Sequence, residues 1–155
     1  MTRRIRKLRF TFSISILVIF VTLFCAAVSY AQHRRSVSGA EVTGTFRQKG
    51  GNEFKILALG KNKLRIGFSG IYVYKYDGLP IANLGEAYGI AVITGDTAVF
   101  KPEATEGCTI TIKFLANRTI DVAQEGYDRI CGFGRNVYSS GTYRKISSKK
   151  PKFKQ

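Results

Sequence analysis

Hydrophobic and polar residues alternate along most of the chain beyond residue 40. The run CTITIKF at 108–114 is the clearest case, because every second residue is apolar and the residues between are Thr or Lys. This period of two is typical of β-strands with one buried face. Similar runs predict strands at 42–48, 54–59, 63–68 continuing through 71–76, 84–94, 97–101, 119–123 and 141–146.

Turn signals separate these runs and fix the fold class. Gly-Gly-Asn at 50–52, Gly-Lys-Asn at 60–62 and Asp-Gly-Leu-Pro at 77–80 each predict a turn, the last because Pro cannot donate to a strand ladder. No helical pattern of useful length occurs beyond residue 31. We therefore predict an all-β fold, an antiparallel meander of about eight strands.

The first and last predicted strands have nearly the same sequence, GTFR at 44–47 and GTYR at 141–144. If these strands pair, the sheet closes into a small barrel and leaves no open edge. An open β-sandwich is the alternative architecture.

The first 31 residues have the pattern of a secretory signal peptide. Residues 2–9 carry five basic side chains and no acidic one, residues 10–31 carry no charge, and the segment ends Ser29-Tyr30-Ala31. This predicts a signal peptide at 1–31, a flexible lead-in at 32–40, a β domain at 41–147 and a basic tail at 148–155. We expect a secreted or periplasmic protein. An uncleaved membrane anchor at 10–31 is the alternative, and would be the chain's one contact with a membrane.

The charge is strongly positive. The formal net charge is +15, and residues 32–155 keep 20 basic against 10 acidic residues, a net charge of +10. Such a protein outside the cytoplasm can meet an anionic glycan, a lipid head group or an acidic envelope protein. Export argues against nucleic acid as the partner. Basic residues cluster near the C-terminus and include Lys149 and Lys150; the alternative is that this tail is only solvated.

Two cysteines, Cys108 and Cys131, remain once the signal segment with Cys25 is removed. In an exported chain this predicts one disulfide. Metal binding is a poor alternative, because no His or further Cys lies near them.

Motifs for catalysis are lacking. The sequence contains no HExxH, G-x-S-x-G, phosphate loop or calcium loop. Glu86 and Asp121 lie within predicted strands, where we expect them to face solvent. We therefore expect no enzymatic activity, no cofactor and no metal site.

Aromatic and basic residues supply the candidate ligand contacts. Tyr72, Tyr74 and Tyr76 form an alternating row on one strand face and suit stacking on a sugar or contact with a protein. The alternative is that the loop containing Pro80 half-buries them. Phe133 and Arg135 belong to a second candidate, the loop at 132–140, which the Cys131 disulfide would hold in place.

Several short motifs resemble a group of small exported bacterial proteins of uncharacterised function. They are GDTAVF at 95–100, CTI at 108–110, CGFG at 131–134, Asn136-Val137 and GTYRK at 141–145. The resemblance covers about residues 41–147 and implies one domain and one disulfide. In size, export and β-rich pattern the chain is also similar to periplasmic lysozyme inhibitors, although those insert loops into a basic enzyme and this chain is itself basic.

These observations favour an exported, non-enzymatic binding protein that contacts an anionic or glycan-like ligand at the cell envelope through the tyrosine row and the basic tail. The alternative is an inhibitor of a cell-wall hydrolase that acts through the loop at 132–140.

Overall fold

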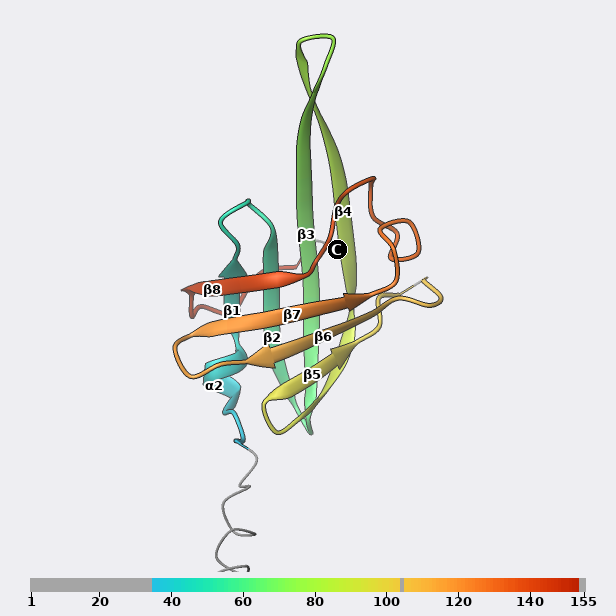
Figure 1. Ribbon diagram of the computed structural model, residues 1–155. Coiled ribbons are helices and arrows are strands. Elements are labelled where there is room, and N and C mark those ends of the chain that lie inside the picture. Colours follow the sequence, from blue (N-terminus) through green and yellow to red (C-terminus); the bar gives the residue numbers. More distant parts are fainter. Residues whose placement is uncertain (1–34, 104, 154–155) are drawn as a thin grey trace, which may run out of the picture. The chain divides into compact units, whose positions relative to one another are not determined.

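The protein is an eight-stranded antiparallel β-barrel, seen here in a computed structural model that describes residues 35–103 and 105–153 (Figure 1). The described elements are α2 (Gly39–Val42), β1 (Gly44–Arg47), β2 (Glu53–Gly60), β3 (Lys63–Tyr76), β4 (Leu79–Thr94), β5 (Thr97–Phe100), β6 (Thr109–Phe114), β7 (Thr119–Glu125) and β8 (Gly141–Ser147). Each strand pairs with the next along the chain, and β8 returns to β1. The all-β prediction is confirmed, and the barrel rather than the sandwich is the correct architecture.

Closure of the barrel depends on the two strands with similar sequences. Phe46 of β1 lies opposite Lys145 of β8, and Arg47 lies opposite Arg144. The register shifts between Thr45 and Phe46, which marks an irregularity where the two strands meet. The predicted pairing of the first and last strands is thus confirmed.

Aromatic side chains from different strands fill the barrel interior. The ring of Phe54 lies 4.9 Å from Phe68 and 5.0 Å from Tyr143, centroid to centroid. The Tyr143 hydroxyl is fully buried and donates to the Ser139 carbonyl at 2.7 Å, so its polar end is satisfied. This packing leaves the interior filled by side chains.

A short helix covers one end of the barrel. Ser38 and Glu41 form a reciprocal capping box at the start of α2, and Val42 is buried. The flexible lead-in expected at 32–40 therefore differs from the structure in its last residues: Ser38 caps the helix, and Gly39 and Ala40 belong to it. The alternation rules used for strands give no signal for a single helical turn.

The hairpin of β3 and β4 is longer than the sequence predicted. The two strands stay paired from Lys63↔Val92 to Tyr76↔Leu79, and only Asp77 and Gly78 form the turn. Both turn residues have positive φ, 49° and 77°, as a type I′ hairpin turn requires. The turn predicted at Asp77-Gly78 is confirmed, but its extension to Pro80 and the strand start at 84 were wrong.

Pro80 fits within the ladder because of its position relative to the turn. The pair next to a two-residue turn, Tyr76↔Leu79, is the hydrogen-bonded one, so at the following pair, Lys75↔Pro80, the backbone nitrogens face outward. The missing N–H of Pro80 therefore removes no bond to β3.

Within the described residues, no helix has the length and apolar character needed to cross a membrane. The predicted signal segment at 1–31 lies outside the described residues.

Candidate functional site

A two-stranded arm, defined as residues 71–84, extends the β3–β4 hairpin past the neighbouring strands (Figure 1). β2 pairs with β3 only as far as Ser69, and β5 pairs with β4 only from Ala91 onward. The large apolar side chains of the arm are exposed on both of its faces: Ile71, Tyr72, Val73, Tyr74, Tyr76, Leu79, Ile81 and Leu84. A ribbon of this kind gains little stability from burial, and its exposed apolar surface makes it the candidate site.

The three tyrosines lie on the same face of β3 as Leu64, Ile66 and Phe68, which point into the core earlier in the strand. Their cross-strand partners are Leu79 for Tyr76, Ile81 for Tyr74 and Asn83 for Tyr72. The rings of Tyr72 and Tyr74 stack at 6.1 Å with an interplanar angle of 25°. Tyr76 is 63% exposed. The alternative in which a proline-containing loop half-buries the row is wrong, because that loop is part of β4.

Asn52 holds the β3 edge of the arm at its base. Its side-chain oxygen accepts from the Ile71 amide at 3.0 Å, and its side-chain nitrogen donates to the Tyr138 carbonyl at 3.0 Å. Asn52 thus joins the turn after β1, the arm and the loop before β8. It is the last residue of the predicted Gly-Gly-Asn turn, and nothing in the sequence marked it as a bridging residue.

The loop at 126–140 holds the β4 edge at the same level. The Gly134 amide donates to the Leu84 carbonyl at 2.8 Å, and the Asn83 side chain donates to the Arg135 carbonyl at 2.7 Å. Both edges of the arm are therefore fixed at residues 71 and 83–84. Beyond them, residues 72–82 form no hydrogen bond to the barrel within the described part of the chain.

The same loop packs against the inner face of the hairpin. Phe133 and Val137 are buried, and the Phe133 ring lies 5.0 Å from the Phe68 ring. Phe133 was a predicted ligand contact, but the structure places it in the core. Arg135 is exposed, and its backbone adjoins Asn83 at the arm base.

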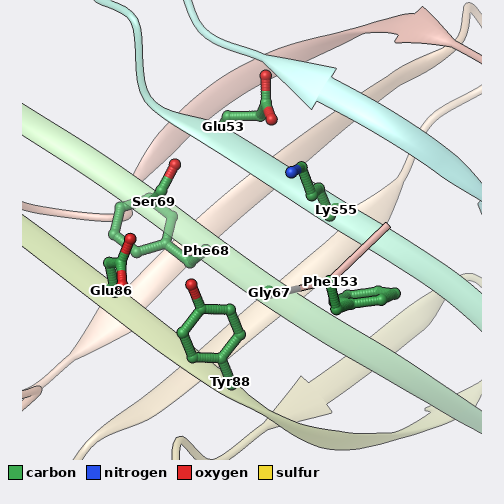
Figure 2. A pocket seen from close by; sticks show the side chains of 8 residues that line it. All are labelled: Glu53, Lys55, Gly67, Phe68, Ser69, Glu86, Tyr88 and Phe153. Atoms are coloured by element: carbon green, nitrogen blue, oxygen red, sulfur yellow. The ribbon is translucent and has the colours of Figure 1, made fainter. Parts of the chain in front are cut away.

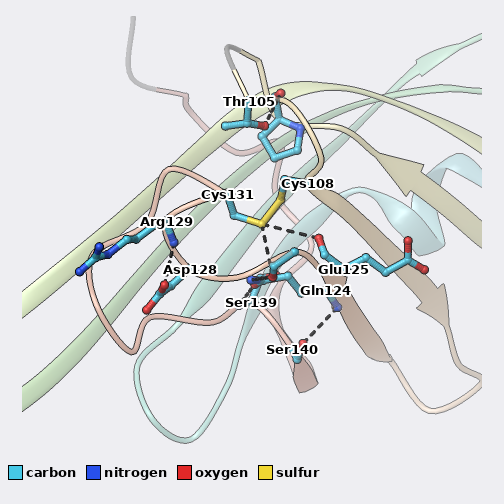
Figure 3. Close-up of a disulfide and its surroundings, with 11 residues drawn as sticks. Thr105, Cys108, Gln124, Glu125, Asp128, Arg129, Cys131, Ser139 and Ser140 are labelled. Carbon is cyan, nitrogen blue, oxygen red and sulfur yellow. Dashed lines mark hydrogen bonds between the residues drawn. A yellow bond between two sulfur atoms is a disulfide. The ribbon is translucent and has the colours of Figure 1, made fainter.

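A disulfide between Cys108 and Cys131 ties this loop to the start of β6, as the sequence predicted (Figure 3). Within the loop, the Asp128 carboxylate accepts from the amides of Asn136 and Arg129, each at 2.7 Å, and these bonds lower the pKa of Asp128. The CGFG motif therefore works as a support for the arm.

The basic tail runs to the other face of the hairpin. The Phe153 ring lies over Gly67, where a Cβ would come within 3.2 Å of it, and beneath the guanidinium of Arg65 at 4.8 Å. Figure 2 shows Phe153 beside a small pocket on the outer face of β2, β3 and β4 that Glu53, Lys55 and Tyr88 also line. Lys149 and Lys150 are exposed in this tail.

Three exposed side chains in the loop that supports the arm were missed from the sequence: Tyr127, Ile130 and Tyr138. All belong to the loop at 126–140, where the sequence has no strand periodicity to assign them a face. Among the described residues, no group of three or more His, Cys, Asp or Glu is placed to hold a metal ion.

Comparison with known proteins gives no independent guide. No family model matches the chain, and neither the curated proteins nor the solved structures contain a significant match. The resemblances noted from the sequence stay predictions.

Proposed function

We propose that this protein is a non-enzymatic binding protein of the cell envelope or exterior, and that it docks on another protein through the arm. One observation carries the proposal: beyond its fixed base, the arm exposes apolar side chains on both faces and leaves both edges unpaired. The fixed base holds the arm in one orientation, which lowers the entropy lost on binding.

A protein partner fits the arm better than a glycan does. The contact between Tyr72 and Tyr74 covers part of each ring, so less ring surface is left for a sugar. A glycan on the tyrosine face would also leave Val73 and Leu84 uncovered on the other face. A protein can cover both faces.

A lipid bilayer fits less well for a different reason. Its hydrocarbon region offers no hydrogen bonds, and the unpaired backbone groups along the two arm edges would stay unsatisfied there. Asp77 at the tip would add the cost of burying a charge. A partner strand, by contrast, can pair with an exposed edge.

The β3 edge is the better edge for such pairing. Every second residue of β3 points its backbone amide away from β4, and the Ile71 amide, which donates to Asn52, is one of these. The amides of Val73 and Lys75 therefore also face outward. On the β4 edge, Pro80 lacks the donor at the corresponding position. Pro80 on β4 and Lys75 on β3 are of the residue types that limit unspecific pairing of exposed sheet edges.

Export is part of the proposal and is supported by the disulfide, since such bonds persist in oxidising compartments. An inhibitor acting through residues 132–140 has less support, because Phe133 and Val137 are buried against the hairpin. Contact of Lys149 and Lys150 with an anionic glycan or lipid head group would use a separate surface.

Site-specific photo-crosslinking in the producing cell tests the proposal. A photoreactive phenylalanine analogue at position 74 should give a defined protein adduct. The same analogue at Leu59, an exposed apolar position on the barrel strand β2, serves as the matched control and should give none. The adduct protein, once purified, should bind Tyr74→Ser at least about tenfold more weakly than the unaltered chain.

Equal adducts from positions 74 and 59 would contradict the proposal. So would a chain that binds only peptidoglycan or anionic vesicles, with the same affinity before and after Tyr74→Ser.

A further inference from the structure

A second hollow lies at the barrel end where α2 sits, away from the arm. This rim pocket has a volume of about 260 Å³ and is built by α2, the start of β1, the β6–β7 turn and the end of β8. Its apolar wall contains Phe46 and Phe114, whose rings meet edge to face at 6.2 Å, together with Val37 and Leu115. A concave apolar site with a few polar groups is the usual form of a small-molecule site.

Positive charge gathers around this wall. Arg35, Arg118 and Lys145 line the rim pocket, against the single acidic residue Glu41. The Glu41 carboxylate is already engaged, since it accepts from Arg35 at 2.9 Å and from the Ser38 amide at 2.8 Å. The pocket therefore keeps an excess of two positive charges.

Lys145 is the least expected of these cations, because it lies on the inward face of β8 and is only 8% exposed. Its ammonium donates to the carbonyls of Ala40 at 3.0 Å and Glu41 at 2.6 Å, and lies 5.2 Å from the centre of the Phe46 ring. These bonds tether α2 and use two of its three donors. Within the described part of the chain, no carboxylate forms an ion pair with it.

Arg118 completes the set from the β6–β7 turn. Its backbone is left-handed, with φ 61°, a conformation that costs a non-glycine residue about 1 kcal/mol or more. Its guanidinium has one weak described partner, the Ser148 hydroxyl at 3.4 Å. Burial, and then the charge of Arg118, lower the pKa of Lys145, and the nearby Glu41 carboxylate offsets this only in part.

We infer that the rim pocket binds a small amphipathic anion, a molecule with one acidic head group and a short apolar body. The head would lie between the Arg118 guanidinium and the remaining Lys145 donor. The body would lie against Val37 and Leu115, which are partly exposed, above the buried rings of Phe46 and Phe114. This site is separate from the arm and does not depend on the proposed protein partner.

Amide chemical shifts of the ¹⁵N-labelled chain, followed during titration, test the inference. Hexanoate and hexyl phosphate are the probes; both have a short alkyl body, and they differ chiefly in the acidic head. Hexanamide keeps the body without the charge, and inorganic phosphate keeps a charge without the body. We expect saturable shifts at residues 115–119 and 145–148 with at least one of the two probes, and binding at least about tenfold weaker for hexanamide and phosphate.

Arg118→Gly gives the decisive variant, because it removes the guanidinium and glycine accepts the left-handed backbone without strain. It should lower the affinity for the probe at least about tenfold. Lys61→Gly is the matched control, since it removes a cation from another left-handed turn position, at φ 49°, and should leave the affinity unchanged.

Three results would overturn the inference. They are no saturable shift with either probe, shifts of equal size with hexanamide, and equal loss of affinity in Arg118→Gly and Lys61→Gly.

Discussion

Gly70 and Gly85 lie opposite each other in the β3–β4 ladder, and Val137 and Phe133 fill the space left by the side chains they lack. This pair marks the level at which the barrel ends and the arm begins. Because the filling side chains belong to the disulfide-tied loop, the orientation of the arm depends on a segment far from it in sequence.

Adding a methyl group at this level should destabilise the protein. The Cβ of Gly85→Ala would come within 2.9 Å of Val137 and 3.0 Å of Phe133, both buried, so we expect a loss of about 1–3 kcal/mol in urea denaturation. Gly50→Ala is the control, because a Cβ there meets nothing within 4 Å, and it should be neutral or slightly stabilising. Equal effects of the two changes would refute the packing argument.

Asn52→Ala should loosen the arm on its β3 side. It removes the bonds to Ile71 and Tyr138, and we expect a cost of about 1–2 kcal/mol and faster hydrogen exchange of the Ile71 amide. Asn83→Ala removes only the bond to the Arg135 carbonyl and should leave that exchange rate unchanged. An Ile71 amide that stays equally protected in Asn52→Ala would show that the bridge does not hold the arm.

Removing the disulfide should weaken the support of the arm as well as the whole fold. Cys108 and Cys131 are 23 residues apart, so replacing both by Ala should cost about 3 kcal/mol, within a usual range of about 2–5 kcal/mol. The Gly134 amide, which bonds to Leu84, should lose protection against exchange. Reduction of the unaltered chain provides the control and should give the same denaturation midpoint as the double variant. Unchanged midpoints after both treatments would contradict this prediction.

Tyr143 should make the fold sensitive to alkali. Burial raises the pKa of its hydroxyl well above the ordinary 10.0. The unfolded chain then ionises first, so the stability is fully present below about pH 10 and is lost as the pH rises toward the raised value. The unfolding free energies of the unaltered chain and Tyr143→Phe should converge by about 1.4 kcal/mol per pH unit above pH 10. Parallel curves between pH 8 and 11 would exclude this origin.

Sequence reasoning succeeded where a local rule decides the structure. The alternation at 108–114 placed Ile110 and Ile112 on the buried face. The repeated Gly-Thr-aromatic-Arg sequence predicted the pairing of the first and last strands that closes the barrel. Two cysteines left a single pairing. Lys145 also carried a usable signal, since it shares a strand face with Tyr143 and is therefore directed inward with an apolar residue.

The rest depends on contacts between distant segments. Pro80 was taken as part of a turn, because only the pairing register shows that its nitrogen faces away from β3. Phe133 was taken as exposed, because the space it fills is made by glycines of another hairpin. The alternation of apolar and polar residues predicts neither the orientation of the Pro80 nitrogen nor the burial of Phe133.

Pairing of β1 with β8 also determines when the barrel can close during synthesis and folding. A chain that lacks its last strand has two open sheet edges, and only the arrival of β8 removes them. This contact joins nearly the whole length of the domain, so its loop closure is the most demanding one in the fold. Until it forms, an emerging chain presents adhesive edges, and a cell that makes this protein has to keep those edges apart until synthesis is complete.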